Sequence, residues 1–208
     1  VGYVASGIFD SKVNTLYLNG VPYPSVSSTG ILDINSIYLG SRFEGNSPNY
    51  FYNGYIGEMM LFDTALSTQD RYVVDQYLGK KWFIDMDTDG DGVFNTEDLY
   101  PTDNRKTINI TSYASGLSKL SSATLSSLKL WLDASSANAM SKTTTGFVKK
   151  WYDLSLNNNV LAQSNPLYYP SYNATAINGK PALYFNGAGD YVPFNSSFLN
   201  NTNYTIFI

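Results

Sequence analysis

A run of acidic residues near the middle of the chain has the residue types and spacing of a cation-binding loop. Residues 87–98 read DTDGDGVFNTED, and carboxylate or amide side chains occupy the first, third, fifth, ninth and twelfth places: Asp87, Asp89, Asp91, Asn95 and Asp98. The sixth place is Gly92, which permits a sharp turn, and the seventh is Val93, which offers its backbone carbonyl. Because Ca²⁺ is a hard cation that takes about six to eight oxygen ligands, this pattern predicts a calcium-binding loop.

The spacing is that of an EF-hand loop, with departures that indicate a different context. The twelfth place is Asp98 and not the longer Glu, and Pro101 follows too closely for a long exit helix. The segment resembles thrombospondin type 3 repeats and related bacterial repeats, with their DxDxDG spacing and a following proline and aspartate. Pro101 and Asp103 match that tail, whereas Tyr100 stands where the family has cysteine. The resemblance implies a structural calcium site between domains, with Asp103 or Asp85 completing the shell or binding a second ion; the alternative is a solvated acidic turn.

Composition and charge exclude several classes of function. The chain has 208 residues, 43% of them hydrophobic and only 14% charged, below the usual quarter. It contains no cysteine and no histidine, which excludes disulfides, thiol chemistry and histidine-dependent catalysis. The net charge is −4, and the negative charge is concentrated in one segment, because residues 85–103 hold seven acidic and no basic residues. With no basic stripe and no apolar run of about 20 residues, we expect neither nucleic-acid binding nor a membrane span.

These features favour a secreted or cell-surface protein, and the lack of cysteine favours a prokaryotic source. The lack of cysteine alone would also fit a cytosolic protein. The chain opens without a signal peptide, so the sequence indicates either a processed protein or an internal piece.

Hydrophobic patterning predicts a mainly β protein with one helix. The helix is expected over residues 67–81, with Ser67 as its cap, Asp70 in its first turn and Lys80 and Lys81 at its end. Residues 105–127, rich in Ser, Thr and Ala, are predicted to be a linker with a weak helical tendency. Strands are predicted at residues 1–8, 14–18, 36–40, 54–62, 128–132, 147–152, 181–185, 191–194 and 204–208.

Two parts of the chain resemble the laminin-G-like, concanavalin A-like lectin/glucanase family. Residues 53–82 (NGYIGEMMLFDTALSTQDRYVVDQYLGKKW) and LYLNGV at 16–21 resemble the end of such a domain. LKLWLDAS at 128–135, VKKWYDLSLNNN at 148–159 and NGKPALYFNGAGDYV at 178–192 resemble its start. The resemblance implies antiparallel, jelly-roll β-sandwich segments. It divides the chain into the C-terminal part of one sandwich (1–83), a calcium loop (84–104), a linker (105–127) and the N-terminal part of a second sandwich (128–208).

The order of these parts is late half, calcium loop, early half. Two explanations stay open at this point. The chain is a fragment of a tandem array, or each chain completes a sandwich with the next chain, head to tail, and so builds a filament. Both explanations make further copies of the same domain the expected partner.

The family resemblance also suggests a binding site at the rim of the sandwich. Some members bind calcium or sugar there, and Asp190 in the NGAGDY turn is the best positional match, with Asn186 and Asp153 as weaker candidates. The alternative is that Asp190 and Asn186 only shape a Gly-rich turn. Trp131 and Trp151 have the chemistry to stack on sugar rings, but they are more often core residues.

Three functions follow from these observations. The first is a calcium-stabilised structural or adhesive module of a large extracellular protein, and the second is a carbohydrate-binding, lectin-like module. The third is a glycoside hydrolase, which requires two carboxylates about 5–9 Å apart. Glu58 stands alone in GEMM, with only Asp63 at the end of that strand, so we expect no enzyme activity.

Overall fold

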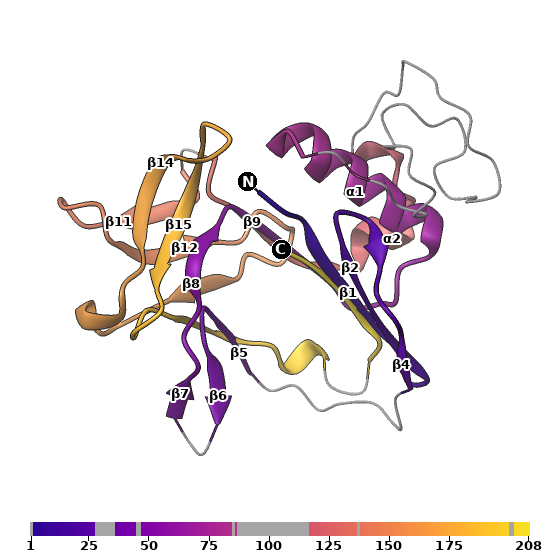
Figure 1. The fold of residues 1–208 in the computed structure, drawn as a ribbon, viewed down its shortest axis with the longest axis horizontal. Coiled ribbons are helices and arrows are strands. Elements are labelled where there is room, and N and C mark those ends of the chain that lie inside the picture. Colours follow the sequence, from indigo (N-terminus) through magenta and orange to yellow (C-terminus); the bar gives the residue numbers. More distant parts are fainter. Residues whose placement is uncertain are drawn as a thin grey trace. The chain divides into compact units, whose positions relative to one another are not determined.

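A computed structural model describes residues 2–27, 36–44, 47–84, 86, 117–136, 138–199 and 202–208. It shows a mainly antiparallel β protein with few helices, as the sequence predicted (Figure 1). The chain divides into two compact units. Unit 1 comprises Val1–Ile31, Leu61–Leu128 and Thr202–Ile208, and unit 2 comprises Leu32–Met60 and Lys129–Asn201.

Unit 1 is built on an antiparallel sheet that joins the two ends of the chain. Its strands are β1 (Ala5–Phe9), β2 (Val13–Leu18), β3 (Val21–Pro22), β4 (Val26–Ser27) and β17 (Tyr204–Phe207). β1 pairs with β17, with Ser6 opposite Phe207, and with β2, with Ala5 opposite Leu18. The strand order of the sheet is β10-β9-β17-β1-β2-β3, and β4 also pairs with β2. The boundary between the units falls within β9 (Glu58–Phe62) and within β10 (Leu128–Asp133).

The helix of unit 1, α1 (Thr68–Trp82), confirms the prediction for residues 67–81. Ser67 Oγ accepts a hydrogen bond from the Asp70 N–H at 3.1 Å and donates to Asp70 Oδ2 at 2.8 Å, which satisfies the first turn. Phe83, the residue after the helix, has a left-handed φ of 55°, which ends the helix. Tyr72, Val74 and Leu78 are buried, so the apolar face of α1 contributes to the core.

Two described segments next to the acidic region pack in unit 1. Met86 is 2% exposed, and a Cβ added at Gly79 of α1 would lie 2.6 Å from Met86 Cγ, so Met86 lies directly against the helix backbone. On the other side, the 3₁₀ helix η1 (Leu117–Lys119) contacts α1 and leads to buried Leu120 and the short helix α2 (Ser122–Ser126). The described part of the predicted linker is therefore helical and partly buried.

Unit 2 contains several small antiparallel sheets, with the orders β11-β12-β13, β14-β15-β8, β16-β5 and β6-β7. Its core includes Trp151, Leu161, Leu183 and Phe185, all at most 1% exposed. The remaining elements are β5 (Ser36–Leu39), β6 (Arg42–Glu44), β7 (Ser47–Asn49), β8 (Asn53–Ile56), β11 (Met140–Lys142), β12 (Val148–Tyr152), β13 (Val160–Ala162), η2 (Pro166–Tyr168), β14 (Ser171–Ile177), β15 (Lys180–Asn186), β16 (Val192–Asn195) and η3 (Ser197–Leu199).

In each unit, strands from the first part of the chain pair with strands from the last part. In unit 1, β1 pairs with β17, and in unit 2, β8 pairs with β15 and β5 pairs with β16. The sequence analysis considered only partners outside the chain for the two sandwich segments. In the structure the two segments pair strands with each other, which is an arrangement within one chain that the sequence analysis did not consider.

Most predicted strands are present, with shifted ends. The run predicted at 54–62 is two strands, β8 and β9, separated at Gly57. The edge strand β14 and the short strands β3, β4, β6, β7, β11 and β13 were not predicted. Among the described residues, no helix is long and apolar enough to cross a membrane.

Candidate functional site on the β14-β15-β8 sheet

The predicted calcium ligands lie outside the described residues. They are Asp87, Asp89, Asp91, Val93, Asn95, Asp98 and Asp103. Their chemistry fits a hard cation, because every one of these donors is an oxygen. Among the residues that the structure describes, no group of three or more acidic side chains could hold a metal ion. The calcium loop therefore stays a prediction from the sequence.

The rim candidate Asp190 closes its own turn. Asp190 is 6% exposed; its Oδ2 accepts from the Asn186 N–H at 3.1 Å and its Oδ1 from Asn186 Nδ2 at 2.9 Å. In return, Asn186 Oδ1 accepts from the N–H groups of Ala188, Gly189 and Asp190. Burial raises the pKa of the Asp190 carboxyl above its ordinary value, although the bond from the Asn186 backbone opposes that rise. Both carboxylate oxygens thus have partners inside the turn, and a role for Asp190 in binding a ligand stays a prediction.

The weaker candidate Asp153 has a comparable structural position. Its Oδ1 accepts from the N–H groups of Trp131 at 2.9 Å and Ser155 at 2.8 Å. Its Oδ2 accepts from Ser155 Oγ at 2.8 Å, from Asn159 Nδ2 at 2.8 Å and from the Asn159 N–H at 3.2 Å. Asp153 therefore organises the loop after β12 and attaches it to β10.

The two tryptophans and Glu58 lie mostly inside unit 2. Trp151 is completely buried, so it belongs to the core. Trp131 is half-buried, and its Nε1 donates to Glu58 Oε1 at 2.7 Å. Glu58 itself is 5% exposed. Its carboxylate therefore orients an indole ring.

A different set of residues meets on the outward face of the β14-β15-β8 sheet. Side chains alternate between the two faces of a strand, and Leu183, Phe185 and Ile56 point into the core. The register places Tyr184 opposite Tyr55 and opposite Ser171, and Asn186 opposite Asn53. By this alternation the opposite face consists of Asn53, Tyr55, Ser171, Asn173, Lys180, Ala182, Tyr184 and Asn186, of which Ala182 is completely buried, and we call it the tyrosine–asparagine face.

Two tyrosines and two asparagines form a connected cluster on this face. The rings of Tyr55 and Tyr184 have centroids 5.1 Å apart at an interplanar angle of 44°. Tyr184 Oη donates to Asn53 Oδ1 at 3.1 Å, and Asn173 Nδ2 donates to Tyr55 Oη at 3.4 Å. Tyr55 is 39% exposed. The bonds fix the edges of both rings and leave aromatic surface in contact with solvent.

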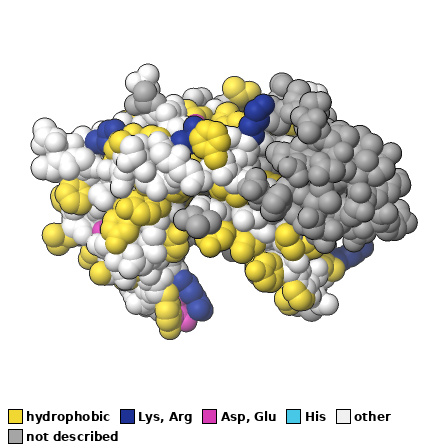
Figure 2. Space-filling model, turned by 45° about the horizontal axis from the view of Figure 1, so that its top comes forward, with side chains coloured by type: hydrophobic (Ala, Val, Ile, Leu, Met, Phe, Trp, Pro, Cys, Tyr) yellow, Lys and Arg dark blue, Asp and Glu magenta, His cyan; other side chains and the backbone are white. Residues whose placement is uncertain are grey.

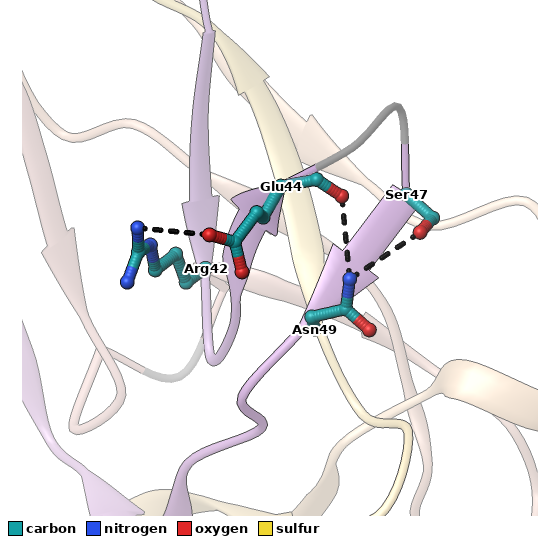
Figure 3. Close-up of polar contacts among 4 residues, drawn as sticks. All are labelled: Arg42, Glu44, Ser47 and Asn49. Carbon is teal, nitrogen blue, oxygen red and sulfur yellow. Dashed lines mark hydrogen bonds and ion pairs between the residues drawn. The ribbon is translucent and has the colours of Figure 1, made fainter.

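The neighbouring β6-β7 hairpin has a charged surface instead. Arg42 Nη2 lies 3.2 Å from Glu44 Oε1, and the Arg42 guanidinium lies over the ring of Tyr50 at 5.5 Å. Figure 3 shows Asn49 pointing at the Glu44 carbonyl and at Ser47, with bonds of 3.2 and 3.4 Å. Because both charged side chains of this pair are well exposed, the ion pair contributes little to stability.

The sequence did not predict the tyrosine–asparagine face. Its residues come from three strands, and only the register of β15 with β8 and β14 brings them together. The one local signal is an alternation of aromatic and amide residues at Asn53–Tyr55 and Tyr184–Asn186. Comparisons of the chain with family models, curated proteins and solved structures found no match.

Proposed function

We propose that this chain is a calcium-stabilised structural and adhesive module of a secreted or cell-surface protein. The observation that carries the proposal is the loop sequence at 87–98, with five side-chain oxygen donors and Gly92 at ligand spacing. Clustered carboxylates repel one another without a cation, and binding of Ca²⁺ would relieve that repulsion. In this proposal calcium has a structural role and performs no chemical step.

The described residues on both sides of the loop support a link between calcium binding and stability. Met86 packs on α1 at Gly79, and after the acidic region η1 contacts the same helix. The chain is thus attached to α1 both directly before the predicted ligands and further on at η1, and such attachment lowers the entropy that calcium binding must overcome. Binding to the folded chain alone then stabilises unit 1 by mass action.

Strand pairing supports the proposed laminin-G-like origin of the flanking segments. The segment proposed as a late half and the segment proposed as an early half supply paired strands to each other, as β8 with β15 and β5 with β16. Halves of one kind of domain would have such complementary edges. In a tandem array or a head-to-tail filament, the same edges would pair with the matching half of a neighbour.

Calcium titration tests the proposal. We expect thermal unfolding to shift upward in millimolar CaCl₂ relative to EGTA, with a gain of about 2.7 kcal/mol when free calcium is about 100 times its Kd. Asp89→Asn combined with Asp91→Asn should abolish the shift, because these changes remove two of the carboxylates. Isothermal titration on the same samples measures binding directly.

A matched control removes a negative charge elsewhere. Glu44→Gln changes an exposed carboxylate on β6, and this variant should keep the full calcium response. Absence of calcium binding at millimolar concentration, or an equal response in the Asp89→Asn/Asp91→Asn variant, would contradict the proposal.

A further inference from the structure

We infer that two copies of this chain associate face to face through one face of the sheet in unit 1, the face on which Phe9, Leu16 and Ile206 lie. Its large side chains are apolar and at least partly exposed to solvent. The inference goes beyond the proposed function, because it uses neither the calcium loop nor the family resemblance.

The strand register defines which side chains share this face. In an antiparallel sheet, residues directly opposite one another share a face, and so do alternate residues of one strand. Gly7 lies opposite both Ile206 and Leu16, which joins β17, β1 and β2. A Cβ added at Gly7 would lie 2.6 Å from the Phe9 ring and 3.2 Å from Leu16 Cδ2, so both side chains lie over Gly7. Phe9 in turn stacks on Tyr204, with ring centroids 4.5 Å apart.

The strands beyond β2 continue the same face. β3 and β4 both pair with β2, and their register places Val21 and Val26 on this face. The Tyr23 N–H donates to the Leu16 carbonyl at 2.8 Å, so Tyr23 lies beside Leu16. The most exposed apolar members are Leu16 (55%), Val21 (39%), Tyr23 (54%), Val26 (67%) and Ile208 (38%). Phe9, Leu18, Tyr204 and Ile206 are partly exposed, and we call these nine residues the unit 1 apolar face.

The polarity of this sheet differs from that of a sheet with one solvated face. In such a sheet one face is apolar and packs on the core, and the other face is polar. Here the side toward the core includes Ser6 and Thr205, both at most 5% exposed, and Tyr17, whose ring lies 4.0 Å from the Arg71 guanidinium of α1. The unit 1 apolar face lies on the opposite side. Soluble monomers rarely expose an apolar patch larger than a few hundred Å², so we expect this face to be covered.

The charge of the face favours a second copy as its occupant. None of the nine residues is Lys, Arg, Asp or Glu, and the nearest charged residues along β1 and β2, Asp10 and Lys12, have opposite signs. Among the described residues, Figure 2 shows basic and acidic side chains in only a few places on the surface in view. Two such faces meet without repulsion between like charges, and the two-fold contact of a dimer requires a self-complementary surface. A lipid surface is a poorer match, because the face has no basic residue to contact headgroups.

The size of the face fits a weak dimer. Antiparallel sheets pack face to face about 10 Å apart. Four strands about 4.8 Å apart and about six residues long give about 400 Å² of flat area, to which projecting side chains add. Because a stable interface buries about 800 Å² on each partner, we expect association only at high concentration.

Sedimentation velocity of the full chain over a range of concentrations tests this inference. We expect a monomer at about 5 μM and a rising fraction of dimer, with no larger species, up to about 500 μM. Samples in CaCl₂ and in EGTA separate this dimer, which should form in both, from assembly that depends on calcium. Leu16→Glu places a charge near the centre of the face and should weaken association by roughly tenfold or more. Because Leu16 is exposed in the single chain, this variant should stay folded.

Matched variants separate the face from a general effect of added charge. Leu167→Glu changes an exposed leucine of η2 in unit 2 and should associate as the unsubstituted chain does. The chain has no cysteine, so Leu16→Cys also reports on geometry. Oxidation should link two copies through this single position, since a two-fold contact brings the centres of both faces together, and Leu167→Cys should not link.

Four results would overturn the inference. They are a folded chain that stays monomeric at every concentration, a dimer that forms only in calcium, unchanged association of Leu16→Glu, and growth beyond the dimer. A monomeric chain that binds neutral phosphatidylcholine vesicles, and loses this binding in Leu16→Glu, would assign the face to a lipid surface instead.

Discussion

The two units stabilise their buried carboxylates in different ways. In unit 1, Asp75 Oδ2 lies 2.6 Å from Arg71 Nη1, and both side chains are almost completely buried. In unit 2, Asp153 and Asp190 lie in turns, where backbone N–H groups and amide or hydroxyl side chains surround them. A charge is thus balanced by an opposite charge in one unit and by oriented dipoles in the other.

The difference follows from the local structure around each carboxylate. Asp75 is inside α1, where the backbone N–H groups are already used by the helix, so a side chain must provide the partner. Arg71 also lies over Tyr17 at 4.0 Å and reaches the Gly20 carbonyl at 3.4 Å, which connects α1 to β2 and its turn. Asp153 and Asp190 lie where the backbone leaves a strand and its N–H groups are available.

The largest effect is expected from separating the ion pair of unit 1. Arg71→Met should lower the free energy of unfolding by about 3–5 kcal/mol, because it leaves a buried carboxylate without its guanidinium. Urea unfolding followed by circular dichroism measures this loss. The double variant Arg71→Met/Asp75→Leu should recover most of the stability, since apolar residues of similar size replace both charges. If Arg71→Met cost less than about 1 kcal/mol, the buried Asp75 carboxylate would not depend on Arg71 for its stability.

A smaller effect is expected from removing the dipole-balanced carboxylate of unit 2. Asp153→Ala should cost about 2–3 kcal/mol, because it leaves the N–H groups of Trp131, Ser155 and Asn159 without their acceptor. Asp153→Asn should cost less, since one acceptor oxygen remains. Asp10→Ala is the matched control: Asp10 Oδ1 accepts from the N–H groups of Lys12 and Val13, but on the exposed surface, where water can replace it. Equal losses for Asp153→Ala and Asp10→Ala would show that burial does not determine the cost.

These contacts also show what could be read from the sequence and what could not. The cap of α1 was predictable, because Ser67 and Asp70 are three residues apart and the motif is local. The calcium loop was proposed from consecutive residues for the same reason. Strand β14 was missed because its sequence, SYNATAI, does not alternate between apolar and polar residues. This fits its position in the structure, where its side chains are half-buried or exposed. The tyrosine–asparagine face depends on pairing Tyr55 with Tyr184, which are far apart along the chain, and no local pattern specifies that register.

The smallest effect is a difference in pH dependence between two aspartates with opposite pKa shifts. Burial raises the pKa of Asp190 above 3.8, so the folded chain binds this proton more tightly than the unfolded chain. Its contribution to stability therefore falls as the pH rises from about 3.8 through the folded-state pKa. Bonds from the Val13 and Lys12 N–H groups lower the pKa of Asp10, so its contribution is present above 3.8 and is lost as the pH falls through the folded-state pKa.

Thermal unfolding of Asp190→Asn and Asp10→Asn across the acid range measures both contributions. Asp190→Asn should become more stable relative to the unsubstituted chain as the pH rises above 3.8, the ordinary pKa of an aspartate carboxyl. The reason is that this variant does not have to bury a negative charge. Asp10→Asn should lose stability relative to the unsubstituted chain as the pH rises from the lowered folded-state pKa of Asp10 to about 3.8, because it no longer has the carboxylate that two N–H groups favour. Slopes of the same sign for the two variants would mean that burial does not dominate at Asp190. The Asn186 bonds would then control its protonation, as backbone N–H groups do at Asp10.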